Sequence, residues 1–140
     1  MTSWGRVLLT TAAVSTTAVA LAPAAAADDV SFTSPSGNIA CMIVDDLLRC
    51  DIQTRDWSPP SRPADCPDMT GYGQGISMRA TGSASFVCAG DTTFGGGAAL
   101  PYGQFQAGGG MSCRSEPSGM RCSNSDGHGF TLSRQAYTLF

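Results

Sequence analysis

The chain has 140 residues, a length typical of one domain; 42% of them are hydrophobic and 14% charged, which excludes a charge-rich disordered tail. All eight cationic side chains are arginine, so chemistry that depends on a lysine nucleophile is excluded. The net charge of −3 argues against a nucleic-acid partner. The six cysteines, an even number, predict disulfides formed in an oxidising compartment.

Residues 1–27 have the pattern of a secretory signal peptide. Arg6 supplies a positive charge, an apolar stretch follows over 7–21, and three alanines at 25–27 form a small-residue cleavage site. The apolar stretch is shorter than the roughly 20 residues that span a bilayer. We therefore expect a secreted protein without a transmembrane anchor, cleaved near Ala27, with one β domain over residues 28–140.

An internal repeat organises the rest of the chain. Cys41 and Cys50 are nine residues apart, as are Cys113 and Cys122, and the two pairs are offset by 72 positions. Each unit reads as an apolar segment with a cysteine, a turn, and then an apolar residue, an arginine and a cysteine. With two-residue loops at 45–46 and 117–118, each cysteine pair lies directly opposite on neighbouring strands.

The repeat favours one of the fifteen possible disulfide pairings. It predicts Cys41–Cys50 and Cys113–Cys122, and by remainder Cys66–Cys88. The alternative is that the bridges cross between the hairpins. A zinc site is a poorer interpretation because there is no C-x-x-C pair and one histidine in the chain.

The remaining segments also favour strands and turns. The proline-rich stretch 57–63 is a connector that cannot lie within a sheet, whereas 84–89 and 129–132 are expected strands. Residues 133–137 are expected to form one helical turn capped by Ser133. The predicted fold class is all-β: a small disulfide-linked sheet assembly built on two similar C-x8-C hairpins, with loops rich in glycine and proline.

Several short segments together resemble a known family. The chain is similar to small exported proteins of mycobacteria and related actinobacteria that are classed as a domain of unknown function. The matching segments are Phe32-Thr33-Ser34-Pro35-Ser36-Gly37-Asn38-Ile39 before Cys41, Arg49-Cys50-Asp51-Ile52, Trp57, Pro59-Pro60, Cys88-Ala89-Gly90-Asp91-Thr92, Leu100-Pro101-Tyr102-Gly103, Gly127-His128-Gly129-Phe130, Leu132-Ser133-Arg134, Tyr137 and Phe140. Met69-Thr70-Gly71-Tyr72-Gly73 stands where the family pattern leads us to expect a Trp-Gly pair. The resemblance implies secretion and a disulfide-linked β domain, and it implies no activity.

The candidates for catalysis are few. His128 could act as a base with Asp126 or Asp91 in a small extracellular hydrolase, but no G-x-S-x-G elbow marks a nucleophile. The flanking glycines favour a structural role, with the ring of His128 bonded to a main-chain carbonyl in a tight turn. We expect no cofactor, no metal and no catalytic residue.

A non-enzymatic binding role is the favoured interpretation. Trp57 and Tyr102 lie in loops where aromatic rings can contact a ligand. Arg49 and Arg121 occupy equivalent repeat positions on the face opposite the cysteines, where a pair of guanidinium groups could bind a carboxylate or a sugar acid. With His128 they are the candidate binding residues for an envelope or extracellular ligand.

Two alternatives to that binding interpretation stay open. The aromatic side chains could instead cover a thin core, with the arginines facing solvent or paired with Asp51 and Glu116. The loop over 59–67, tied by Cys66, could instead belong to a protease inhibitor.

Overall fold

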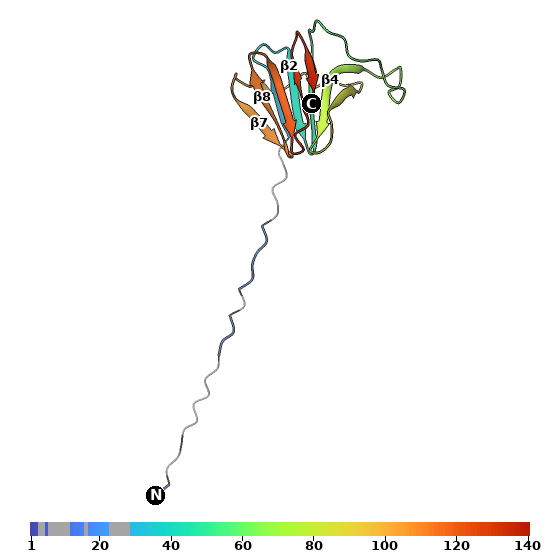
Figure 1. Ribbon diagram of the computed structural model, residues 1–140. Helices are drawn as coiled ribbons and strands as arrows, with labels where there is room; N and C mark the ends of the chain where they lie inside the picture. The colour runs from blue at the N-terminus through green and yellow to red at the C-terminus, as the bar shows by residue number, and fades with distance from the viewer. Residues whose placement is uncertain (3–4, 6–11, 16, 23–28) are drawn as a thin grey trace.

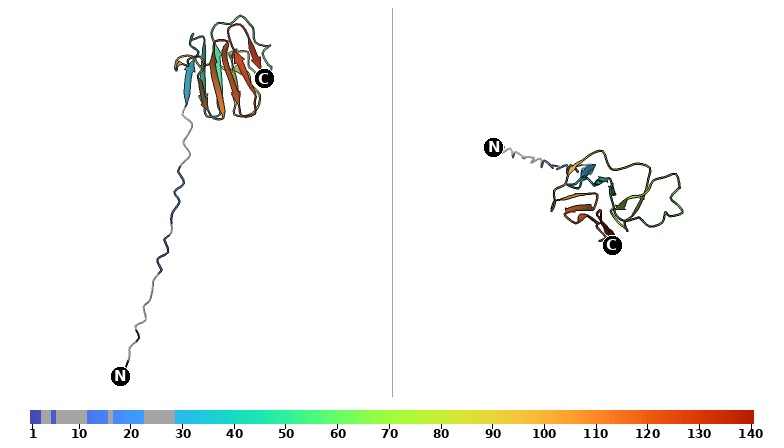
Figure 2. Two further views of the ribbon diagram at one scale, coloured as in Figure 1. Left: turned by 60° about the vertical axis from the view of Figure 1, so that its left-hand side comes forward. Right: turned by 90° about the horizontal axis from the view of Figure 1, so that it is seen from above.

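A computed structural model describes residues 1–2, 5, 12–15, 17–22 and 29–140. The described residues form no helix, and their strands make two antiparallel-rich sheets packed face to face (Figures 1 and 2). The strands are β1 (Val30–Thr33), β2 (Ile39–Val44), β3 (Leu47–Ile52), β4 (Tyr72–Arg79), β5 (Ser85–Cys88), β6 (Ala98–Ala99), β7 (Phe105–Gly108), β8 (Met111–Glu116), β9 (Gly119–Asn124), β10 (Gly129–Leu132) and β11 (Tyr137–Leu139). The all-β prediction is confirmed.

Each sheet contains one of the two repeated hairpins. The six-stranded sheet has the order β5-β4-β3-β2-β1-β6, and the five-stranded sheet has the order β11-β10-β9-β8-β7. The hairpin β2–β3 and the hairpin β8–β9 therefore lie in different layers of a β-sandwich, as the view from above in Figure 2 shows. All pairings are antiparallel except β1 with β6, which is parallel.

The register of both hairpins follows from their turns. In the first hairpin, Val44 pairs with Leu47, and Asp45 adopts a positive φ of 52°, which aspartate tolerates better than most residues. In the second hairpin, Glu116 pairs with Gly119, whose φ of 133° favours glycine. Two-residue loops thus bring the cysteines of each unit opposite one another, as the sequence predicts.

The two hairpin disulfides meet at the centre of the core. Cys41–Cys50 and Cys113–Cys122 each join directly paired residues with Cα atoms 4.0 Å apart, and all four cysteines are fully buried. The Sγ atoms of Cys50 and Cys122 lie 3.8 Å apart, so the two bridges touch across the gap between the sheets. Apolar side chains from both inner faces surround them, and the largest of those that are fully buried are Phe130, Ile43, Leu48, Ile76, Met120 and Leu132.

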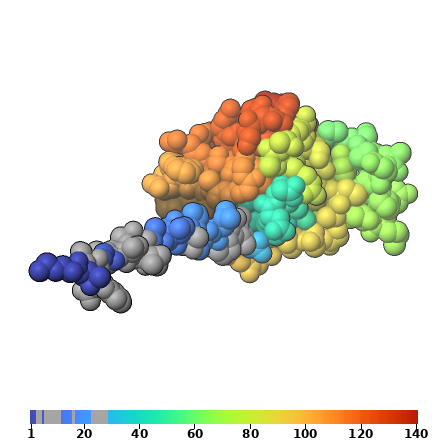
Figure 3. Space-filling view, turned by 90° about the horizontal axis from the view of Figure 1, so that it is seen from below, coloured from blue at the N-terminus to red at the C-terminus, as the bar shows by residue number. Residues whose placement is uncertain are grey.

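The third bridge lies outside this centre. Cys66–Cys88 joins β5 to the long segment between β3 and β4, which projects to one side of the sandwich (Figures 1 and 3). All three predicted pairings are present, and no cysteine is free. The segment 53–71 contains no strand, as its prolines predict.

One local prediction is wrong. Residues 133–136 form a turn between β10 and β11 in place of a helical turn, and β11 begins at Tyr137. The hydroxyl of Ser133 accepts a hydrogen bond from the Ala136 N–H at 3.1 Å, as a helix cap would. The chain then pairs with β10, which places Leu139 opposite Phe130 and Tyr137 opposite Leu132. Both residues of β10 are fully buried.

The predicted leader is only partly described. Arg6 and the cleavage site at 25–27 lie outside the described residues. Among the residues that are described, no helix is both long enough and apolar enough to cross a membrane.

Candidate functional site

The first candidate residue, Arg49, is buried beneath a loop. Its side chain projects from β3 on the outer face of the six-stranded sheet, where its Nε and Nη2 atoms donate to the two carboxylate oxygens of Asp51, both at 2.8 Å. Its Nη1 atom donates to Asp91 at 2.6 Å, and Nη2 also donates to the Asp91 main-chain oxygen at 2.9 Å. Arg49 is only 5% exposed.

Residues 89–94 follow β5, and we call them the covering segment. They complete the hydrogen-bond network around Arg49. The Thr93 N–H donates to Asp51 at 3.0 Å, and its hydroxyl donates to the Ala40 carbonyl at 2.6 Å. Burial acts to lower the pKa of Arg49, but the hydrogen bonds to Asp51 and Asp91, together with their charges, raise it overall. The hydrogen bond from Arg49, and its charge, lower the pKa of Asp91. Arg49 and Asp91 thus hold the covering segment onto the sheet.

Trp57 belongs to an aromatic cluster against the core. Its ring lies 4.7 Å from that of Tyr137 and 6.2 Å from that of Phe86, both centroid to centroid. Its Nε1–H donates to the Ser133 carbonyl at 2.9 Å, and the Arg55 guanidinium stacks on its ring. Trp57 therefore joins β5 of one sheet to β11 of the other, so here the aromatic side chains cover a thin core.

Tyr102 stands apart from the other candidate residues. It is exposed beside a polar hollow of about 140 Å³ at one end of the sandwich. The hollow is formed by the turns β1–β2, β8–β9 and β10–β11. These turns carry most of the Ser-Pro-Ser-Gly-Asn and Leu-Ser-Arg segments of the sequence resemblance.

His128 lies in the turn between β9 and β10. Its N–H donates to the Asn124 side chain at 3.1 Å, and its Nδ1 lies 3.3 Å from the main-chain oxygen of Phe140. Because that oxygen can only accept, Nδ1 carries the proton in this contact. Asp126 accepts from the Gly82 N–H at 2.8 Å. Both candidate catalytic groups thus make contacts that hold the chain together.

The loop over 59–67 is tied internally. Arg62 donates to the carbonyls of Pro67 and Thr70 at 2.8 and 2.7 Å, and also lies against Cys66. Its guanidinium therefore points into the loop.

Arg121 lies on the outer face of the other sheet, and the structure does not bring it near Arg49. Because the two hairpins present their cysteines to each other, both arginines point outward from opposite sides of the sandwich. The cross-strand partner of Arg121 is Arg114 on β8. Directly paired residues of this kind have Cα atoms roughly 5.5 Å apart. Two outward-facing arginines are therefore neighbours on this sheet, in a different combination from the one predicted.

We call this surface the arginine face. It comprises outward-facing residues of β7, β8 and β9, namely Phe105, Ala107, Ser112, Arg114, Arg121 and Ser123, with Glu116 beside them at the end of β8. Arg114 has one carboxylate nearby, that of Glu116 at 3.9 Å. Phe105 is 67% exposed.

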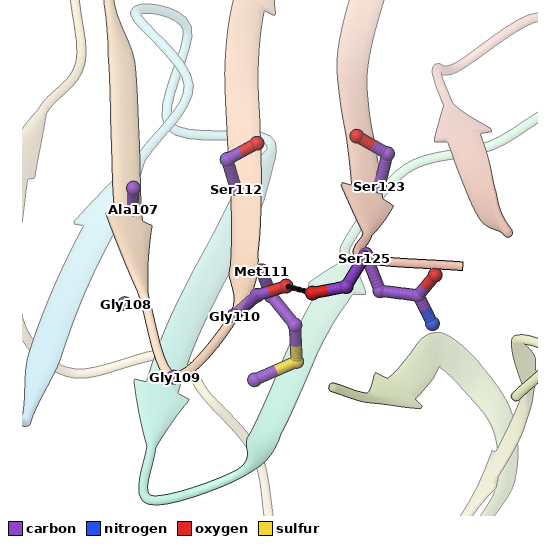
Figure 4. A pocket seen from close by; sticks show the side chains of 9 residues that line it. Ala107, Gly108, Gly109, Gly110, Met111, Ser112, Ser123 and Ser125 are labelled. Carbon is purple, nitrogen blue, oxygen red and sulfur yellow. Dashed lines mark hydrogen bonds between the residues drawn. The ribbon is translucent and has the colours of Figure 1, made fainter. Parts of the chain in front are cut away.

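Two adjoining hollows lie on the arginine face. One, of about 260 Å³, is lined by the arginines and Phe105, and the other, of about 510 Å³, lies over the β7–β8 turn. Ser112 and Ser123 line both, so the hollows lie side by side. Figure 4 shows their hydroxyl groups directed toward each other from neighbouring strands. Within the described part of the chain neither hydroxyl makes a hydrogen bond.

Phe140 supports Arg121 from the side of β10. The Arg121 guanidinium lies 4.3 Å from the centre of the Phe140 ring, a cation–π contact. The ring packs against Gly129, where a Cβ atom would come within 2.8 Å of it. Main-chain hydrogen bonds between Gly129 and Phe140, of 2.9 and 3.0 Å, and the contact from His128 fix Phe140 in place.

Equivalence between the two repeat units does not point to Arg114. Arg114 aligns with Met42, which is not charged. The signal that finds it is the hairpin register, since a count that places Cys113 opposite Cys122 also places Arg114 opposite Arg121. Its place beside Phe105 depends on the strand β7, for which the sequence has no clear local signal.

The fold and these sites define a disulfide-linked β-sandwich with one outer face covered by a loop and one bearing paired arginines. The chain belongs to the DUF6636 family, a family of unknown function, whose model matches residues 12–140. No curated protein and no solved structure gave a significant match.

Proposed function

We infer that the protein is exported and acts as a non-enzymatic binding module of the cell envelope or extracellular space. Three disulfides suit an oxidising compartment, and the sequence of residues 1–27 suits export. N-terminal sequencing of the protein from the medium should begin at Asp28. A product that keeps residues 1–27 would count against export.

The module binds an anionic ligand through the arginine face. The single observation that carries this proposal is the direct pairing of Arg114 with Arg121 on an exposed sheet. Like charges in directly opposite positions destabilise a sheet, and a bound carboxylate would remove that cost by accepting hydrogen bonds from both guanidinium groups. The chain is acidic overall, but on this face two arginines stand beside one carboxylate, that of Glu116.

Citrate provides a direct test of anion binding. In an NMR titration, the Nε–H signals of Arg114 and Arg121 should shift with citrate concentration, whereas that of buried Arg49 should not. The double variant Arg114→Gln/Arg121→Gln should lose the response. The matched control Arg79→Gln/Arg134→Gln, with the same net charge, should keep it. Equal shifts at all exposed arginines, or none at Arg114 and Arg121, would refute the proposal.

A hydrolase that uses His128 with Asp126 or Asp91 is the alternative. The contacts of these three residues with Phe140, Gly82 and Arg49 favour structural roles over catalysis. His128→Ala should therefore lower the thermal unfolding temperature, because the contact to Phe140 is lost. An unchanged unfolding temperature would favour the hydrolase.

A further inference from the structure

The side chains of the arginine face form two rows that cross the strands. The register places Phe105 opposite Arg114, and Arg114 opposite Arg121. The second row, two residues along each strand, consists of Ala107, Ser112 and Ser123. Since residues i and i+2 share a face of a strand, both rows lie on the same solvent-facing side of the sheet.

The second row consists of small side chains and lies beside the larger side chains of the first row. We call the second row the serine floor. The two adjoining hollows, which together we call the trough, lie over this floor and reach the β7–β8 turn. The floor spans three strands, a width of roughly 10 Å at the usual strand spacing. A shallow surface of this width suits an extended chain better than a compact small molecule.

The chemistry of the trough suits a sugar acid unit. Arg114 and Arg121 supply donors for a carboxylate. The hydroxyls of Ser112 and Ser123, without partners in the described chain, can both donate to and accept from sugar hydroxyls. The exposed ring of Phe105 offers a flat apolar surface on which the C–H face of a pyranose can pack.

Other polyanions match the surface less well. An acidic peptide supplies carboxylates but has no row of hydroxyls for Ser112 and Ser123, and the open trough offers no deep pocket for its side chains. Binding of a nucleic acid depends on neutralising many phosphates. Two arginines on an acidic chain can neutralise few of them.

We propose that the ligand of the arginine face is an acidic polysaccharide whose carboxylate-bearing sugar units lie across β7, β8 and β9. This inference rests on the proposed function, since it names the class of anion that the same face binds. One carboxylate lies between Arg114 and Arg121, the ring next to it packs on Phe105, and the chain continues along the serine floor.

A galacturonate hexasaccharide is the probe. Isothermal titration should show binding to the full chain, and Arg114→Gln or Arg121→Gln should weaken it roughly tenfold. Phe105→Ala should weaken it roughly threefold to tenfold. Ser112→Leu, which fills the trough without changing charge, should also weaken it. Arg79→Gln and Tyr102→Ala, which change an arginine and an exposed aromatic residue elsewhere, should bind as the wild type does.

Comparison probes separate this inference from the general anion-binding proposal. Hexaglutamate and a short DNA duplex should bind more weakly than the hexasaccharide and should be insensitive to Phe105→Ala. If citrate still shifts Arg114 and Arg121 but hexaglutamate or DNA binds as tightly as the hexasaccharide, the polysaccharide is wrong and anion binding stands. If the citrate response is absent, both proposals fail together.

Discussion

The two outer faces of the sandwich come from equivalent hairpins and differ in what covers them. On the six-stranded sheet, Arg49 lies under the 89–94 segment and is neutralised by Asp51 and Asp91. On the five-stranded sheet, the equivalent Arg121 is exposed and lies beside a second arginine. Where Arg49 has Asp51 two residues on, Arg121 has Ser123. The equivalent arginine thus binds the 89–94 segment in one repeat unit and is exposed to solvent in the other.

The largest expected difference between the faces is in stability. Arg49→Ala removes one partner of a buried pair and leaves the Asp51 charge uncompensated, which should lower the free energy of unfolding by about 3–5 kcal/mol. Arg121→Ala removes one exposed cation–π contact and should cost no more than about 1 kcal/mol. Urea denaturation of both variants checks this. Similar losses for the two would mean that the faces do not differ as described.

Gly75 provides a second, smaller test on the covered face. A Cβ atom there would lie 2.3 Å from a carboxylate oxygen of Asp51 and 2.2 Å from the Cys50 carbonyl. Gly75→Ala should therefore destabilise the protein by about 1–3 kcal/mol, because the ion pair must shift. Gly90→Ala, in the covering segment, meets no atom within 4 Å and should change stability by no more than about 0.5 kcal/mol. Thermal unfolding of the two variants measures the contrast.

The pH dependence of the Arg49–Asp91 ion pair should have a smaller effect on stability. Because Arg49 lowers the pKa of Asp91 in the folded protein, this group adds stability at pH values above the ordinary carboxyl pKa, about 3.9. The stability is lost as the pH falls through the lowered folded pKa. Asp91→Asn should thus be less stable than the wild type at pH 7, and the gap should close in acid. A gap that stays constant down to pH 2 would argue against the ion pair.

The smallest effect concerns the exposed face. Arg114→Gln relieves repulsion across the strands and should raise the free energy of unfolding by a few tenths of a kcal/mol, about 0.2–0.5, at low ionic strength. At 1 M salt the gain should disappear, because screening acts strongly on exposed charges. Denaturation at two salt concentrations tests it, with Arg79→Gln as the matched variant. A gain that persists at high salt would have another cause.

The sequence predicted the elements whose signals are local. Turn residues at 45–46 and 117–118 set the register, and the register set two disulfides, so these follow from short stretches of chain. The assignment of each hairpin to its own sheet depends on contacts such as Cys50 with Cys122, which are 72 residues apart. The burial of Arg49 depends in the same way on Asp91 and Thr93, whose segment folds back over β3.

The surroundings of the candidate residues depend on contacts between distant segments for a related reason. An aromatic residue or an arginine is available to a ligand only if no other segment packs over it. The hydrophobicity of the nearby sequence does not show which distant segment packs there. Trp57 looked like Tyr102 in the sequence, but it meets Phe86 and Tyr137 where the sheet edges approach.

The order of the bridges bears on the proposed export of the chain. Each cysteine is joined to the next one along the chain, in the succession Cys41–Cys50, Cys66–Cys88 and Cys113–Cys122. A chain that crosses a membrane from its N-terminus and meets a thiol oxidant presents its cysteines in that same succession. Oxidation in order of emergence yields the native pairing directly, so such a chain matures without the reshuffling that interleaved bridges require.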